Sequence, residues 1–172
     1  MAPITQSDAP PASLIGDFAQ AEAHYTDAFY VDVSAEVDLA HYVYGFYSTP
    51  LFRAERFILK LAARAPSSDA DLAALAQGAG NRFAVWTVEA RRADEILLGD
   101  ASGRTKSWLW AEARDGATRL WFGSVVVPVM QRGRLVQGPV FDTLLGVHKL
   151  YSRLLLGSAV GKMTAVGFVS PL

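Results

Sequence analysis

Residues 104–127, with the sequence RTKSWLWAEARDGATRLWFGSVVV, predict an antiparallel β-hairpin and decide the fold class. Asp115-Gly116 is a strong signal for a two-residue hairpin turn, because both residues tolerate the left-handed backbone that such a turn requires. The flanking segments, Arg104–Arg114 and Thr118–Val127, are rich in aromatic and β-branched residues, which strands favour. We therefore expect the two segments to pair across the turn.

The turn also fixes which side chains share a face of the hairpin. The expected cross-strand pairs are Arg114 with Ala117, Glu112 with Arg119, Trp110 with Trp121 and Trp108 with Gly123. One face then carries the tryptophans together with charged residues, and the other carries no charge. Because burial of an unpaired charge is costly, we expect the uncharged face to pack under helices and the tryptophan face to reach water or a partner.

The rest of the chain predicts further strands and helices around this hairpin. Strands are expected at 24–33, 83–91 and 95–100, and helices at 35–47, from 50 to about 64, from 71 to 78 and from about 140 to 157. Ser34 is the expected N-cap of the first helix. The order of elements predicts an α+β fold in which an antiparallel sheet wraps around a long C-terminal helix. The alternative is a cystatin-like α+β barrel, which needs its long helix early in the chain.

Composition indicates one globular domain: the 172 residues are 51% hydrophobic and 19% charged. The proline-containing residues 1–18 are expected to form an irregular arm, and residues 19–172 a single α+β domain. A net charge of −1 creates no field that attracts nucleic acid. The most apolar stretch, 144–160, is interrupted by charged side chains, so no membrane insertion is expected. No secretory signal is recognisable, and the expected location is the cytoplasm.

The sequence contains no motif for phosphate binding or nucleophilic catalysis, and no two histidines have metal-ligand spacing. No metal and no cofactor is therefore expected. His148 is the histidine of most interest, because it lies among apolar residues of the predicted last helix. Such a histidine is usually a core residue satisfied by a hydrogen bond, and the alternative is a general base that projects into a cavity.

Three stretches carry a resemblance to a known family: His24-Tyr25-Thr26-Asp27-Ala28-Phe29, Glu95-Ile96-Leu97-Leu98-Gly99-Asp100 and Val147-His148-Lys149-Leu150. With the order of elements, they make the chain resemble a bacterial family of unknown function related to the helix-grip proteins of the START and Bet v 1-like (SRPBCC) superfamily. The resemblance spans roughly residues 24–157. It implies an apolar pocket between the sheet and the C-terminal helix. It also marks Asp27 and His148 as positions to test, without supplying an activity.

The function that these expectations favour is binding of a small hydrophobic molecule, without catalysis. The expected pocket lining consists of Leu109, Ala111, Leu120, Phe122, Leu144, His148 and Tyr151. One alternative is a homodimeric interaction module with Trp108, Trp110 and Trp121 as its anchors, because tryptophan is favoured at interfaces. We expect a homo-oligomer on the same ground. The other alternative is an enzyme, such as a cyclase or hydratase, in which His148 acts with a nearby carboxylate.

Overall fold

The computed structural model describes residues 3–21, 24–50, 52, 67–127, 129–131, 134–136 and 153–164. The strands in this part of the chain are β1 (Thr5–Ser7), β2 (Tyr25–Val33), β3 (Arg82–Phe83), β4 (Trp86–Arg91), β5 (Glu95–Asp100), β6 (Thr105–Arg114), β7 (Ala117–Val126), β8 (Val129–Gln131) and β9 (Arg134–Val136). The helices are α1 (Gly16–Gln20), α2 (Leu39–Tyr47) and α4 (Asp69–Gln77), and residues 153–164 are also helical. Most of the helix predicted at 50–64, and most of the one predicted at 140–157, lies outside the described residues.

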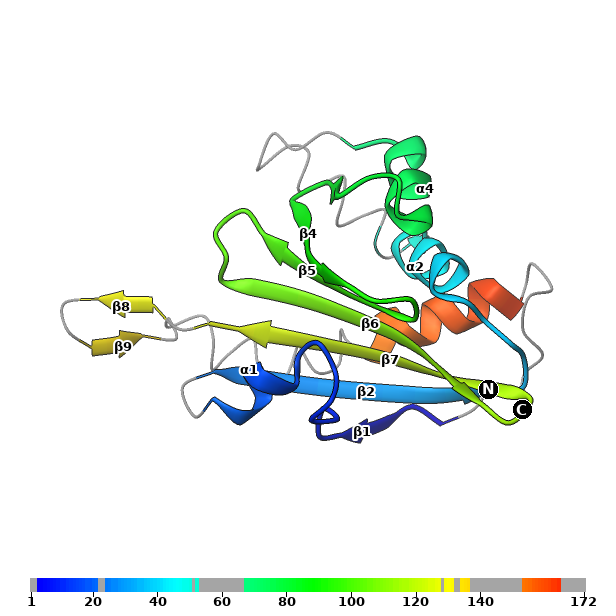
Figure 1. The fold of residues 1–172 in the computed structure, drawn as a ribbon, viewed down its shortest axis with the longest axis horizontal. Helices are drawn as coiled ribbons and strands as arrows, with labels where there is room; N and C mark the ends of the chain where they lie inside the picture. Colours follow the sequence, from blue (N-terminus) through cyan, green and yellow to red (C-terminus); the bar gives the residue numbers. More distant parts are fainter. Residues whose placement is uncertain are drawn as a thin grey trace.

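Seven of these strands form one open antiparallel sheet, in the order β1-β2-β7-β6-β5-β4-β3 (Figure 1). The β6–β7 hairpin confirms the predicted turn and register. Gly116 has a left-handed backbone with φ of 66°, Trp110 pairs with Trp121, and Trp108 pairs with Gly123. The predicted strands at 24–33 and 95–100 are β2 and β5, and the one predicted at 83–91 is divided between β3 and β4. The fold is therefore α+β with an antiparallel sheet, as expected.

Helix α2 begins later than predicted, and its N-cap is Asp38 rather than Ser34. The Asp38 carboxylate accepts a hydrogen bond from the backbone N–H of His41 at 2.8 Å. The cause of the later start is Thr118 on β7. Its hydroxyl donates to the backbone carbonyl of Ala35 at 2.7 Å and accepts from the backbone N–H of Val37 at 2.9 Å. These two bonds tie the chain between Ser34 and Asp38 to the sheet, so it does not coil into the helix.

Glycine was predicted to end two helices, and it ends α4 but not the helix at residues 153–164. Ser68 and Asp71 form a capping box, so α4 begins at Asp69 rather than at the predicted Asp71. Gly78 ends it in a left-handed conformation with φ of 75°, as predicted. Gly157, in contrast, lies inside the helix at 153–164 rather than at its end. Buried apolar residues continue beyond it through Val160 to Met163, and their packing outweighs the unfavourable helix propensity of glycine. No helix among the described residues is both long and apolar enough to cross a membrane.

The inner face of the sheet packs under the helices and forms the main core. Phe122 of β7 lies against Phe46 of α2, with ring centroids 4.9 Å apart. The uncharged face of the hairpin is the one that lies here, as predicted. The fully or nearly fully buried members of this core include Phe29, Leu109, Ala111, Leu120, Phe122, Tyr42, Phe46, Leu72, Leu156 and Ala159.

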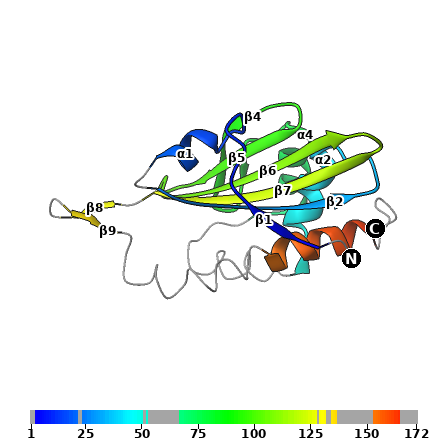
Figure 2. The same ribbon diagram turned by 90° about the horizontal axis from the view of Figure 1, so that it is seen from below.

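The N-terminal arm is more ordered than predicted. Residues Thr5–Ser7 form β1, which extends the sheet by pairing with β2, and α1 lies on the outer face of the sheet, on the side opposite residues 153–164 (Figure 2). The arm is held by apolar side chains, Leu14, Ile15 and Phe18, which pack on the tryptophan face. Burial of these side chains offsets the entropy lost when the arm is ordered.

Candidate functional site

The tryptophan face is covered in part by the protein's own N-terminal arm. Trp108 is fully buried and Trp121 is 4% exposed, and both pack with Ile15 in a second apolar cluster on the outer face. Gly123 makes this contact possible. A Cβ atom at that position would lie 2.7 Å from Cδ1 of Ile15 and 2.9 Å from Cε3 of Trp108. The face that was expected to meet water or a partner at Trp108 therefore meets the arm there.

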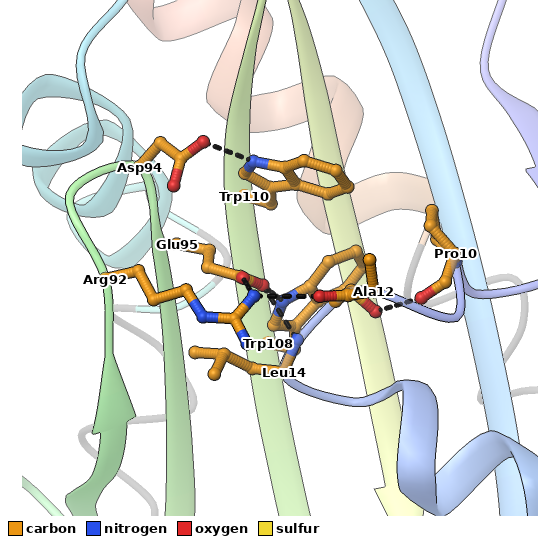
Figure 3. Close-up of polar contacts among 9 residues, drawn as sticks. Pro10, Ala12, Leu14, Arg92, Asp94, Glu95, Trp108 and Trp110 are labelled. Carbon is orange, nitrogen blue, oxygen red and sulfur yellow. Dashed lines mark hydrogen bonds and ion pairs between the residues drawn. The ribbon is translucent and has the colours of Figure 1, made fainter.

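Glu95 fastens the arm to this face (Figure 3). Its side chain is only 2% exposed, and its Oε2 accepts from the Trp108 indole N–H at 2.8 Å and from the Leu14 backbone N–H at 2.9 Å. The Arg92 guanidinium donates to Glu95 Oε1 at 2.6 Å and to the backbone carbonyl of Ala12 at 2.8 Å. A buried carboxylate is tolerated only when it is paired and hydrogen-bonded, and Glu95 meets both conditions. The cluster joins the strand, the tryptophan and the arm.

Beside the part that the arm covers, the tryptophan face forms an aromatic strip that consists of Tyr30, Trp110, Arg119 and the largely buried Trp121. The Trp110 and Trp121 rings stack, with centroids 6.3 Å apart and planes 16° apart, and Tyr30 lies 4.9 Å from Trp121. The Arg119 guanidinium lies over the Tyr30 ring at 3.9 Å. Tyr30 and Trp110 are partly exposed. The strip thus presents flat aromatic edges and a cation to its surroundings.

The charges on the tryptophan face are paired within the chain, which explains how they sit beside buried aromatics. Arg119 forms a bidentate pair with Asp32, at 2.7 and 2.8 Å, and this hydrogen-bonded cation holds the Asp32 pKa below its ordinary value. Lys106 is nearly buried and donates to both oxygens of Glu89, at 2.7 and 2.6 Å. Gly99 leaves room for that carboxylate, because a Cβ there would overlap Glu89 Oε1.

The sheet residues of the predicted ligand pocket lie together, but inside the packed core. Leu109 and Leu120 are fully buried, and Ala111 and Phe122 are 5% exposed. All four belong to the main core with Phe46. The other three predicted lining residues, Leu144, His148 and Tyr151, lie outside the described residues, and so does the histidine of the enzymatic alternative.

An apolar hollow, absent from the sequence expectations, lies one layer further out. It has a volume of about 520 Å³ and lies between α2, α4 and residues 153–164. Its described lining consists of Ala40, His41, Tyr44, Gly45, Ala73, Ala76, Gln77, Lys162 and Met163. We call it the helix hollow. Its size is within the range of small-molecule sites, about 300–1,000 Å³.

Small side chains create the helix hollow. Gly45 lets α2 approach residues 153–164 so closely that a Cβ there would lie 3.0 Å from Cγ of Met163. On α4, Ala73 and Ala76 line the hollow with short side chains, which leave its space open. Lys162 lies at one edge, where its ammonium donates to the Ser48 carbonyl at 2.9 Å and hydroxyl at 2.6 Å. Three separate elements contribute these residues, so no single stretch of sequence carries a signal for the hollow.

A row of buried polar groups crosses the inner face of the sheet near the start of β2 and β6 and the end of β7. Asp27 on β2, only 4% exposed, accepts hydrogen bonds from the backbone N–H and the hydroxyl of Ser124 on β7. Ser124 pairs with Ser107 on β6, whose hydroxyl bonds the Tyr47 hydroxyl of α2 at 2.7 Å. Asp27 is the position that the family resemblance marked for test, and the structure places its carboxyl within this row.

Metal ligands do not gather in the described part of the chain, where no group of three or more His, Asp or Glu side chains could hold an ion. The helix hollow and the aromatic strip differ in chemistry. The hollow is mainly apolar and concave, and the strip consists of aromatic rings beside paired charges. Comparison of the chain with family models, with curated proteins and with solved structures finds no match.

Proposed function

We propose that the protein binds a small hydrophobic molecule in the helix hollow. The observation that carries this proposal is the hollow itself, a mainly apolar concavity of about 520 Å³ whose lining includes three alanines, Gly45 and Met163. Transfer of apolar surface out of water stabilises such a complex by about 25 cal/mol per Å². Met163 at its base is a flexible side chain that adapts to ligands of different shape.

Polar groups at the edge of the hollow would orient the ligand. Tyr44 is 38% exposed, and its ring lies 6.0 Å from the Lys162 ammonium. His41 and Gln77 add a ring nitrogen and an amide at other points of the edge. A ligand with an apolar body and one polar end matches this distribution, with the body between the helices and the polar end at the edge.

We further propose that the fold is of the helix-grip type. The open antiparallel sheet, the helices packed on its inner face and the helical residues 153–164 near the end of the chain support this assignment. In proteins of that architecture the ligand lies between the sheet and the last helix. Here the described sheet residues of that region are packed against α2, and the described opening lies between α2, α4 and residues 153–164.

Titration with N-phenyl-1-naphthylamine, a neutral apolar fluorophore, tests the proposed function. The Ala73→Phe variant fills the hollow from a half-buried position on α4 and is expected to weaken binding of the fluorophore by at least about tenfold. Ala70→Phe, at an exposed position one turn earlier on the same helix that is not among the lining residues, is the matched control and is expected to bind like the native protein. Equal binding by all three proteins would contradict the assignment of the hollow.

A second candidate function is self-association through the aromatic strip, and the partial exposure of Tyr30 and Trp110 favours it. The occupant is a second copy of this chain, because the surroundings of the strip carry charges of both signs. Arg119 and Arg114 lie beside Asp32 and Glu112. In a two-fold contact, each basic group of one copy can face an acidic group of the other, so such a surface is complementary to itself.

A further inference from the structure

A second hollow, polar rather than apolar, lies where the N-terminal arm crosses from β1 to α1. It has a volume of about 410 Å³ and is enclosed by the arm on one side and the first residues of β2 on the other. Four of the residues that line it carry polar side chains that matter here: Asp8, Gln20, His24 and Thr26. We call it the arm hollow. It lies on a different part of the molecule from the helix hollow and shares no lining residue with it.

Two buried polar atoms in the lining have no hydrogen-bond partner in the part of the chain that the structure describes. They are Nδ1 of His24 and Oγ1 of Thr26, and both are shielded from solvent. A polar atom buried without a partner costs about 1–3 kcal/mol. Native proteins keep such atoms where a ligand, an ion or a bound water completes the hydrogen bonding. Both atoms belong to residues that line the same hollow, so one ligand can meet both.

The lining offers hydrogen-bond acceptors and carries negative charge. It contains the carboxylate of Asp8 and the amide of Gln20, and no lysine or arginine is among its described residues. Nδ1 of neutral histidine accepts a hydrogen bond when Nε2 carries the proton, and a threonine hydroxyl accepts readily. This environment disfavours an anion and favours a cation that donates hydrogen bonds.

We infer that the arm hollow is a binding site for a small organic cation with an ammonium group. His24 Nδ1 and Thr26 Oγ1 accept hydrogen bonds from the cation, and the carboxylate of Asp8 supplies the opposing charge. The site also has a structural consequence. Because the arm forms one wall, a bound cation holds the arm against β2, and its occupation stabilises the folded protein.

Three ligands of the same length test the inference, with amide NMR spectra of the full chain as the readout. They are 1,5-diaminopentane, 1,5-pentanediol and glutarate, which share a five-carbon skeleton and differ in their ammonium, hydroxyl and carboxylate ends. Saturable shifts at residues 24–27 are expected with the diamine, and the affinity is expected to exceed that for the diol and for glutarate by about tenfold or more. Equal affinity for the three, or preference for glutarate, would overturn the inference.

Variants then locate the site. Thr26→Val and His24→Phe each remove one acceptor while keeping a side chain of similar shape, and each is expected to weaken diamine binding by about tenfold. Thr87→Val on β4, remote from the hollow, is the matched control and is expected to bind normally. Thermal melting of each variant shows whether it is folded. Unchanged binding by both folded variants, or no saturable shifts in the native protein, would overturn the assignment.

Discussion

The indole N–H of Trp108 donates to Glu95 Oε2 at 2.8 Å, inside a cluster where neither side chain is more than 2% exposed. The same oxygen accepts the backbone N–H of Leu14, which belongs to the N-terminal arm. One carboxylate therefore accepts hydrogen bonds both from the sheet and from the arm that covers it. This arrangement explains how a large aromatic side chain is kept dry on the outer face of the sheet.

Glu95→Ala is expected to destabilise the protein by about 3 kcal/mol, because it leaves a buried donor on Trp108 and a partly buried donor on Leu14 without an acceptor. Urea unfolding measures the change. Asp94→Ala, which removes the exposed acceptor of the Trp110 indole, is the matched control and is expected to cost less than about 1 kcal/mol. Similar losses for the two variants would show that Glu95 does not anchor the arm.

Gly123→Ala is expected to destabilise the protein by about 1–3 kcal/mol, because the new Cβ would overlap Ile15 and the Trp108 ring. Part of the loss is expected to be recovered in the double variant Gly123→Ala, Ile15→Ala, which a double-mutant cycle measures. Gly161→Ala is the opposite case: it lies in the helical residues 153–164 with open space at its Cβ, and is expected to stabilise by up to about 1 kcal/mol. Additive effects of the first two substitutions would contradict the contact.

Because of the Asp32–Arg119 pair, we predict that the stability of the folded protein depends slightly on pH in the acidic range. The hydrogen bond from Arg119 lowers the Asp32 pKa in the folded protein, so the carboxylate stabilises the fold above the unfolded value of about 3.8. That contribution is lost as the pH falls below this value through the folded pKa. Because the Asp32 side chain is 42% exposed, we expect less than about 1 kcal/mol. As the pH is lowered from neutral to acidic, the melting temperature should fall more steeply for the native protein than for Asp32→Asn. Equal falls in melting temperature would contradict the pair's role.

Self-association through the aromatic strip predicts that Trp110→Ala shifts the protein toward the monomer in sedimentation velocity. Loss of a central aromatic anchor typically weakens an interface by about 2 kcal/mol or more. Leu154→Ala removes an exposed apolar side chain elsewhere, 51% exposed on the helix at 153–164, and is expected to leave the distribution unchanged. A native protein that sediments as a monomer at every concentration would rule out this second candidate function.

The hairpin was predictable because its determinants are local. Asp115-Gly116 sets the turn, and the alternation of residues on each side sets the faces. The start of α2 was not, because Ser34 and Asp38 are both good caps and the choice depends on Thr118, a residue far away in the sequence. The strongest sequence signals were thus those that need no tertiary information.

The candidate sites were less predictable for the same reason. The apolar residues of the arm are interspersed with prolines and polar residues, and only their contact with Trp108 shows that they form part of the core. The helix hollow exists because Gly45, Ala73 and Ala76 lack large side chains, and small residues at scattered positions produce no periodic pattern. The predicted lining from the sheet was a coherent group, but it lies beneath α2 rather than in an opening.

Native mass spectrometry of the protein mixed with decanol, a small molecule with an apolar body and one polar end, tests the central claim most directly. The account predicts one bound decanol per chain for the native protein and for Ala70→Phe, and none for Ala73→Phe, whose new ring occupies the helix hollow. Bound decanol that persists in Ala73→Phe, or its absence from the native protein, would contradict the claim that the helix hollow is the binding site.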